Sequence, residues 1–392
     1  MKKVLYSTLF FLLFLSCHNE EIETILINLP PSEVEINIVS SIDENNYTVL
    51  EEFFIGSHHN STILTSDGNL VHVGGGKQPY SSQKMVLVKT NTNGEILYFK
   101  ELFQEWYGSA LGVLEDSEEN IYVVGYTHTQ SGIAYRKLAV AKLDANGNVL
   151  WENNYQLSLE DAFGSNVLIL PNNQIMVSGS KSGNPMFLKI NPTGEEVLFS
   201  IKESSTFCST LGMVLLEDGR ILLTGSSGEN AKLSWYDTET NLLEEKKYGS
   251  MMKISRGLST IQLRDGNLLL AGRTTSVTSN NIVTGGAVLL LKTDVNGELI
   301  WSKTLGDTHH FNIDGQSLRE NEDGSFVLYG YDWYDHMLFY LDSEGNEINS
   351  KYYRDSLSHK GTNIVKLGNE RNVLTGSYQG GTFFLNVDNY GL

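Results

Sequence analysis

Short apolar runs separated by polar turns recur along the chain, and helix-period patterns of apolar residues are absent. The interval 259–306 shows the arrangement. There "STIQL" leads through "RDGN" into "LLLAG", and after a variable loop "AVLLLKTD" leads through "VNG" into "ELIWSKTLG". Asp-Gly and Asn-Gly favour the positive backbone angles that tight hairpins need. The interval therefore predicts four short antiparallel strands.

A hairpin signature, Asp or Asn followed three positions later by Gly, recurs about every fifty residues, which is the period of a repeat architecture. The copies are Asn91–Gly94, Asp144–Gly147, Asn191–Gly194, Asp294–Gly297, Asp342–Gly345 and Asp388–Gly391. A degenerate copy, "DTETN", begins at Asp237, and we assign Asn241 to the place of its glycine.

A second signature runs in phase with the first and consists of a turn, a short aliphatic run and a glycine. Its glycines are Gly74, Gly125, Gly179, Gly225, Gly272, Gly330 and Gly376. Two independent markers in a fixed order indicate seven structural repeats. Four antiparallel strands per repeat, arranged around an axis, predict an all-β, seven-bladed β-propeller.

The two ends of the repeat region predict how the ring closes. The seventh repeat stops after its third strand, at "TFFLNVDNYGL", whereas "YTVLEEFFIGS" (Tyr47 to Ser57) matches the fourth-strand position of "ELIWSKTLGD". We therefore expect the N-terminal strand to complete the last blade, which gives a propeller over residues 47–392.

Two tryptophans follow the hairpins "KLDANGNVLW" and "KTDVNGELIW", and we expect Trp151 and Trp301 to pack between neighbouring blades. The Asp-x-x-Gly-x-x-x-Trp pattern resembles the docking repeat of quinoprotein-like propellers and the repeats of many secreted bacterial propellers. This resemblance spans residues 47–392 and implies a fold rather than an activity. No cofactor is expected, because the vicinal cysteines of some quinoprotein dehydrogenases are missing.

The first sixteen residues carry two lysines and then an apolar run from Leu9 to Leu15, which is too short to cross a bilayer. We interpret residues 1–16 as a signal peptide. Ser16 before Cys17 resembles the lipobox of bacterial lipoproteins, which implies cleavage before Cys17 and lipid attachment to it. Ordinary secretion is the alternative. Residues 17–46, with a Pro-Pro break, are then a lipidated tether.

The acidic stretch "CHNEEIE" resembles the surface-export signal of Bacteroidetes-type lipoproteins, which implies an outer-membrane location facing outwards; a solvated acidic linker is the alternative. The chain holds 47 Asp and Glu against 28 Lys and Arg, a formal charge of −19. Such a surface repels phosphate backbones, so nucleic acid is not an expected partner. Membrane contact is expected through the lipid alone.

In propellers, ligands usually meet the face built by the loops between second and third strands and by the loops that join successive blades. Aromatic side chains beside polar groups on that face suit sugar rings or peptide segments. The predicted ligand-binding residues are Tyr80, Tyr126, His128, Tyr135, Arg136, Arg256, Arg273, His310, Trp333, Tyr334, His359 and Tyr378. Packing within the loops is the alternative for each of them.

Histidines at the starts of blades one, six and seven raise the question of a metal site. Adjacent histidines in an extended segment point to opposite sides, so the pairs 58–59 and 309–310 each offer one ligand. We favour solvent-exposed or locally bonded histidines over a three-histidine site with His359, and we predict no metal. Cys208 has no evident base, and no nucleophile motif is present.

The sequence thus predicts a surface lipoprotein whose propeller is a non-enzymatic binding platform. The expected partner is another outer-membrane or envelope protein, or an extracellular glycan. The alternative is a carbohydrate-active enzyme, above all a polysaccharide lyase, because some propeller lyases use His, Tyr and Arg and this chain has those residue types on the same expected face.

Overall fold

The structure is a computed structural model that describes fifteen segments of the chain. These are residues 24–26, 38–39, 47–50, 61–76, 83–129, 135–155, 161–202, 208–250, 253–277, 283–306, 314–331, 335–354, 359–368, 371–378 and 381–388. Every regular element in them is a β-strand. None of the described segments contains a helix long and apolar enough to cross a membrane.

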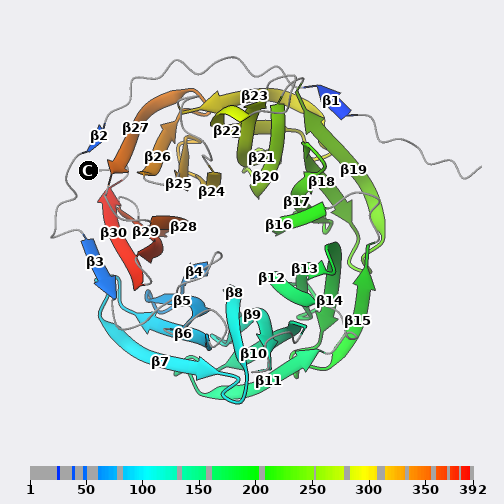
Figure 1. Ribbon diagram of the computed structural model, residues 1–392, viewed down its shortest axis with the longest axis vertical. Helices are drawn as coiled ribbons and strands as arrows, with labels where there is room; N and C mark the ends of the chain where they lie inside the picture. The colour runs from blue at the N-terminus through cyan, green and yellow to red at the C-terminus, as the bar shows by residue number, and fades with distance from the viewer. Residues whose placement is uncertain are drawn as a thin grey trace, which may run out of the picture.

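Most of the strands form seven antiparallel four-stranded blades, and the blades stand in a ring with their first strands at the centre (Figure 1). Blade 1 holds β4 (Ser61–Leu64), β5 (Leu70–Gly75), β6 (Met85–Thr90) and β7 (Ile96–Leu102). Blade 2 holds β8 (Tyr107–Glu115), β9 (Ile121–His128), β10 (Lys137–Leu143) and β11 (Val149–Tyr155). Blade 3 holds β12 (Ala162–Ile169), β13 (Ile175–Lys181), β14 (Asn184–Ile190) and β15 (Glu196–Ile201).

The other four blades follow the same order. Blade 4 holds β16 (Cys208–Leu215), β17 (Ile221–Ser227), β18 (Asn230–Tyr236) and β19 (Leu242–Gly249). Blade 5 holds β20 (Lys253–Gln262), β21 (Leu268–Val277), β22 (Val283–Thr293) and β23 (Leu299–Leu305). Blade 6 holds β24 (Asp314–Glu320), β25 (Phe326–Tyr331), β26 (Asp335–Leu341) and β27 (Glu347–Arg354). Blade 7 holds β28 (His359–Leu367), β29 (Arg371–Tyr378), β30 (Gly381–Asp388) and β3 (Tyr47–Leu50). The predicted seven-bladed propeller is confirmed.

In blades 2 to 7 the glycine of the second signature pairs with a residue beside a bulge in the innermost strand. In blade 3 the register between β12 and β13 shifts between Gly164 and Asn166, next to the pair Gly164–Gly179. A Cβ atom on Gly179 would lie 1.9 Å from the carbonyl oxygen of Phe163, so no larger residue fits. The bulge brings two backbones together, and the repeated glycine is the residue that permits it.

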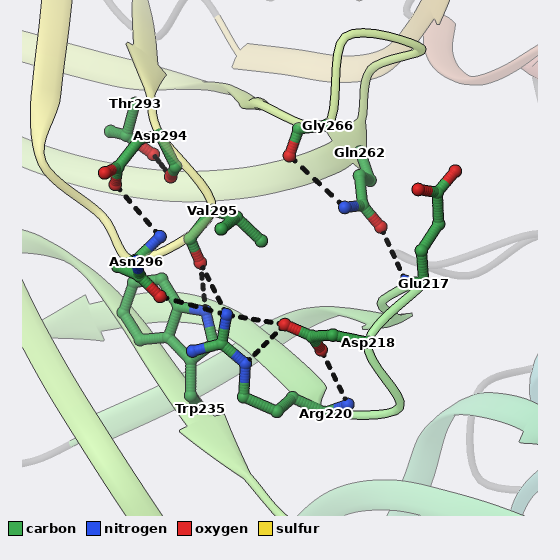
Figure 2. Close-up of polar contacts among 10 residues, drawn as sticks. All are labelled: Glu217, Asp218, Arg220, Trp235, Gln262, Gly266, Thr293, Asp294, Val295 and Asn296. Carbon is green, nitrogen blue, oxygen red and sulfur yellow. Dashed lines mark hydrogen bonds and ion pairs between the residues drawn. The ribbon is translucent and has the colours of Figure 1, made fainter.

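The glycine of the hairpin signature packs on an aromatic side chain of the preceding blade. Gly297 has φ +84°, and a Cβ atom there would lie 2.5 Å from Cη2 of Trp235. Trp235 Nε1 donates a hydrogen bond to Val295 O at 3.0 Å, and Arg220 Nη2 donates to the same oxygen at 3.2 Å (Figure 2). The hairpin turn of blade 5 and the Trp235 side chain of blade 4 therefore hold these two blades together.

Trp151 and Trp301 occupy the corresponding interfaces. Trp151 Nε1 donates to Pro192 O at 3.1 Å, across the interface of blades 2 and 3. A Cβ atom on Gly345 would lie 2.5 Å from Cη2 of Trp301, across the interface of blades 5 and 6. Both tryptophans thus pack between neighbouring blades, as predicted.

The degenerate turn corrects one sequence assignment. Thr240, not Asn241, occupies the glycine position, because its amide donates to Asp237 O at 3.0 Å as Gly147 N does to Asp144 O at 2.9 Å. Thr240 accepts a φ of +63°. In blade 3, Leu198 pairs with Lys189 where Trp151 pairs with Lys142 in blade 2. An aliphatic residue in place of the tryptophan is consistent with the larger turn residue.

The apolar core is divided among the blade interfaces. Each of seven clusters of buried side chains joins two neighbouring blades, and together they cover all seven interfaces. Trp235 and Tyr248, for example, are fully buried in the cluster between blades 4 and 5. Every blade therefore buries both of its faces, each face in a different cluster, and the seven clusters follow one another around the ring.

Blades 7 and 1 meet through a polar network as well as an apolar cluster. Buried His72 shares hydrogen bonds with Thr62 Oγ1 at 3.0 Å and Thr90 Oγ1 at 3.3 Å, and its ring lies edge-on to Phe384. Thr375 Oγ1 donates to Thr62 Oγ1 at 3.1 Å. In blade 7, β3 pairs antiparallel with β30, from Tyr47 opposite Leu385 to Leu50 opposite Thr382.

Two stretches of the expected tether also pair with the ring. β1 (Thr24–Leu26) lies parallel to β19 at the outer edge of blade 4, and β2 (Ile38–Val39) lies parallel to β27 at the edge of blade 6 (Figure 1). Ile25 is half-buried and packs against the cluster between blades 4 and 5. These parts of residues 17–46 follow the rim of the propeller, because exposed edge strands offer unpaired backbone groups to an added strand.

Candidate functional site

The two classes of loop that were expected to share a face are joined by hydrogen bonds. Gly108 N, at the start of blade 2, donates to Gln83 O of blade 1 at 2.7 Å. Ala162 N, at the start of blade 3, donates to Arg136 O of blade 2 at 2.9 Å. Each second-to-third-strand connection thus supports the start of the next blade, and side chains from both gather there.

Aromatic and cationic side chains from blades 1 and 2 form one end of the candidate site. Lys84 Nζ lies 4.7 Å from the ring centre of Tyr107, and it donates to Trp106 O at 3.0 Å. Tyr107 pairs with His128 across β8 and β9, with their ring centres 5.9 Å apart. His128 and Tyr126, two residues apart on β9, stack at 6.3 Å. Alternate residues of a strand share a face, which explains this contact.

The other end of the site is built around Arg136. Its Nε donates to both carboxylate oxygens of Asp161 at 2.8 and 3.0 Å, Nη2 donates to Oδ2, and its backbone N donates to Oδ1 at 3.0 Å. The guanidinium also lies 5.1 Å from the ring centre of Tyr126 and 4.6 Å from that of Phe163. We call the seven residues Lys84, Tyr107, Tyr126, His128, Arg136, Asp161 and Phe163 the aromatic–cation surface.

Electrostatics fix the orientation of two of these groups. Burial acts to raise the pKa of Asp161, but the hydrogen bonds and charge of Arg136 outweigh it and hold the pKa below its ordinary value. Asp161 is therefore ionised and holds the guanidinium in place. His128 Nδ1 donates to Thr129 O at 3.1 Å, which leaves Nε2 to meet a ligand.

The predicted site residues are distributed over several parts of the ring. Tyr126, His128 and Arg136 come together in blade 2, with Tyr135 beside them and 55% exposed. Arg256 and Arg273 are register partners on β20 and β21 of blade 5, which is not a neighbour of blade 2. His359 and Tyr378 are register partners on β28 and β29 of blade 7. The remaining predicted residues, Tyr80, His310, Trp333 and Tyr334, lie outside the described residues, as do Cys17 and the histidine pairs.

Four members of the aromatic–cation surface were not predicted from the sequence: Lys84, Tyr107, Asp161 and Phe163. The signal that points to them is their position, since each stands within two residues of a second-to-third-strand connection or of the start of a blade. Asp161 is the informative case, because a carboxylate at a blade start faces the preceding connection, where Arg136 stands.

Two cavities of about 280 Å³ each lie at the hairpin-turn end of the blades, away from this surface. One lies between blades 2 and 3, beside Asp116 and Pro192. The other lies between blades 6 and 7, beside Asn321 and Lys366. No group of three His, Cys, Asp or Glu side chains within the described segments is placed to hold a metal ion.

The ring resembles solved propellers in fold. The WD40 domain of Neurospora crassa Pan2 matches with a TM-score of 0.56 and 11% identity, covering 88% of this chain and 97% of that one. Drosophila Plexin A, solved in complex with Semaphorin 1b, matches with a TM-score of 0.55 and 10% identity, covering 88% of this chain and 87% of that one. The polysaccharide lyase Uly1 matches with a TM-score of 0.50 and 10% identity, covering 85% and 90%.

Similarity at this level of identity establishes the propeller fold alone. No protein-family model matches the chain, and no curated protein matches it in sequence.

Proposed function

We propose that this protein is a lipid-anchored binding platform of the outer-membrane surface, and that the aromatic–cation surface is where it holds its partner. The observation that carries the proposal is the chain of contacts from Lys84 through Tyr107 and His128 to Tyr126 and Arg136. Cations already fixed against aromatic rings are pre-organised, so little side-chain entropy is lost on binding.

The chemistry of this surface suits an envelope protein or an extracellular glycan. Aromatic rings and arginine are enriched among residues that dominate protein interfaces, and rings also stack on the apolar faces of sugars. Plexin A, a propeller solved with a protein partner, supports the first alternative. The bidentate Arg136–Asp161 pair supports a recognition role, because both groups are engaged with each other rather than poised for proton transfer.

Replacing Tyr107 and His128 together by Ala tests the platform. Both side chains are half-buried, so the variant should keep a melting temperature close to that of the wild type while its partner binds at least tenfold more weakly. Leu243→Ala, an exposed residue of blade 4, is the matched control and should bind normally. Equal binding by all three proteins would rule out this surface.

A polysaccharide lyase is the second candidate, and the orientation of His128 favours it. Its Nδ1 bond to Thr129 O leaves Nε2 available as a base beside Tyr107, with Arg136 in the same blade. The polysaccharide lyase Uly1 shares the fold. His128→Ala separates the two candidates, since loss of polysaccharide cleavage with retained binding would favour the enzyme.

The membrane anchor is tested separately. Cys17→Ala should move the protein from the membrane fraction to the soluble fraction, because a covalent lipid is the proposed attachment. Retention of the variant in washed membranes would contradict the lipid anchor without affecting the binding surface.

A further inference from the structure

Two lysines in and beside the aromatic–cation surface are held by aromatic rings and backbone oxygens instead of by carboxylates. Lys84 Nζ lies 4.7 Å from the ring centre of Tyr107 and donates to Gln104 O and Trp106 O. Lys137 Nζ lies 4.3 Å from the ring centre of Trp106. Among the described residues, no Asp or Glu forms an ion pair with either ammonium group. Both positive charges therefore lack a counter-ion there.

Third-strand lysines at the hairpin-turn end of the blades are arranged differently, because they neutralise carboxylates of the turns. The pairs are Lys89–Asp67 at 2.7 Å, Lys142–Asp116 at 3.6 Å and Lys292–Asp265 at 3.0 Å. The whole chain has a formal charge of −19. Two adjacent ammonium groups without a counter-ion therefore form a local positive surface on an acidic protein, and such a surface attracts negatively charged ligands.

Two carboxylates beside this surface do not cancel its charge. Arg136 Nε donates to both carboxylate oxygens of Asp161, so these two side chains neutralise each other. Glu105 precedes Trp106 in the chain and is exposed to water, which screens its charge. The two ammonium groups outweigh this single exposed carboxylate.

A ligand can reach both lysines and a neighbouring aromatic ring. Lys84 and Lys137 are each partly exposed, and Tyr135 is 55% exposed. Tyr135 stands two residues before Lys137, and two residues span at most about 7 Å. The ring and the ammonium group can therefore meet the same sugar residue or neighbouring ones, the ring against an apolar face and the ammonium group at a charged edge.

We propose that the ligand of this surface is an acidic glycan, a polysaccharide whose sugar residues carry carboxylates. This inference rests on the function proposed above and names the ligand class of the same site. Aromatic rings stack on the apolar faces of sugars, and ammonium groups attract carboxylates. An acidic peptide would use the two charges, but Asp and Glu side chains offer no flat apolar face to Tyr135.

Isothermal titration calorimetry with polygalacturonate, alginate and hyaluronate tests the ligand class. Each polymer is compared at equal ionic strength with its carboxyl-reduced form and with poly-L-glutamate. At least one acidic polysaccharide should bind, and both comparison polymers should bind about tenfold more weakly, because one lacks the charge and the other lacks the sugar rings. The chain is acidic overall, so a general attraction of polyanions does not explain such binding.

The double variant Lys84→Gln, Lys137→Gln removes both charges and keeps a hydrogen-bond donor at each position. It should melt close to the wild type and bind the acidic polysaccharide about tenfold more weakly. Lys84→Arg, Lys137→Arg keeps both charges and should bind as the wild type does. Lys303→Gln, Lys366→Gln removes two charges from blades 5 and 7, and this matched control should also bind normally.

The proposal is overturned if no acidic polysaccharide binds, if a comparison polymer binds equally well, or if the glutamine double variant binds as the wild type does. Failure of the ligand class differs from failure of the platform. A membrane partner that is retained by the wild type and lost from the Tyr107→Ala, His128→Ala variant would preserve the platform even when no acidic polysaccharide binds.

Discussion

At the scale of single residues, the repeat signatures record close approaches between blades. Gly297 has positive φ and no room for a Cβ atom beside Trp235, whereas Gly266 in the same blade has positive φ and open space around it. The same residue type therefore serves two purposes. Thr240 takes a positive φ in blade 4, so backbone conformation alone does not demand glycine at the hairpin position.

Gly297→Ala and Gly266→Ala separate the two purposes. In both variants the alanine at positive φ should lower the free energy of unfolding by about 1 kcal/mol. In Gly297→Ala, overpacking against Trp235 should lower it by about 1–3 kcal/mol more. Chemical denaturation of both proteins measures the difference. Equal losses would show that the turn does not dock on the aromatic residue.

His72 predicts a pH dependence at the junction of blades 7 and 1. Burial lowers its pKa from 6.5 to about 3, so the folded protein keeps the ring neutral while the unfolded chain takes up a proton below pH 6.5. The contribution of His72 to the free energy of unfolding is complete above pH 6.5. Below that pH it falls by about 1.4 kcal/mol per pH unit, down to about pH 3. In the His72→Gln variant the free energy of unfolding should change less steeply with pH across that range. The same slope in variant and wild type would contradict the burial of the His72 ring.

At the scale of elements, the sequence was most informative where each blade repeats the same local rule. Strand order, hairpins and the docking tryptophans could all be predicted, because short apolar runs and Asp-x-x-Gly turns are local signals. The pairing of β1 and β2 with the rim of the propeller could not be predicted, since "TIL" and "IV" are too short to carry a strand signal. Their placement depends on edges offered by distant blades.

The fourth strand of blade 7 makes a strong prediction at this scale. Removal of residues 47–56 should lower the melting temperature clearly, because β30 loses its antiparallel partner β3 and the ring loses the contact between its two ends. A truncated protein that melts with the full-length chain would show that this strand does not hold the ring closed.

Ile25 tests the added strand on blade 4. Ile25→Asp should lower the free energy of unfolding by about 1 kcal/mol, because it puts a charge in place of a half-buried side chain that packs against the blade 4–5 cluster. Hydrogen exchange at Lys247–Gly249, the register partners of β1, should become faster. Ile25→Leu is the control and should protect these amides as the wild type does.

At the scale of the whole molecule, the pairing of β1 limits how far the ring can stand from a membrane. With the lipid proposed at Cys17, the chain up to Thr24 can span at most about 25 Å. The rim of blade 4 would then lie near the bilayer. Such a placement suits a partner in the same membrane.

The candidate site could be only partly predicted at this scale. Tyr126, His128 and Arg136 were recognised because they lie at or beside one second-to-third-strand connection, but Asp161 and Lys84 come from neighbouring blades and meet Arg136 and Tyr107 only in the folded ring. The sequence repeats show on which face of the propeller a residue lies. The neighbours that make it functional depend on loop conformations, which do not repeat.

The central claim is that the aromatic–cation surface holds a partner at the cell surface. Its most direct test is purification of the native protein from membranes in mild detergent, in parallel with the Tyr107→Ala, His128→Ala variant, followed by mass spectrometry of retained proteins and glycans. We predict a stoichiometric partner with the wild type that is lost with the variant. The same partner in both preparations, or none in either, would contradict the account.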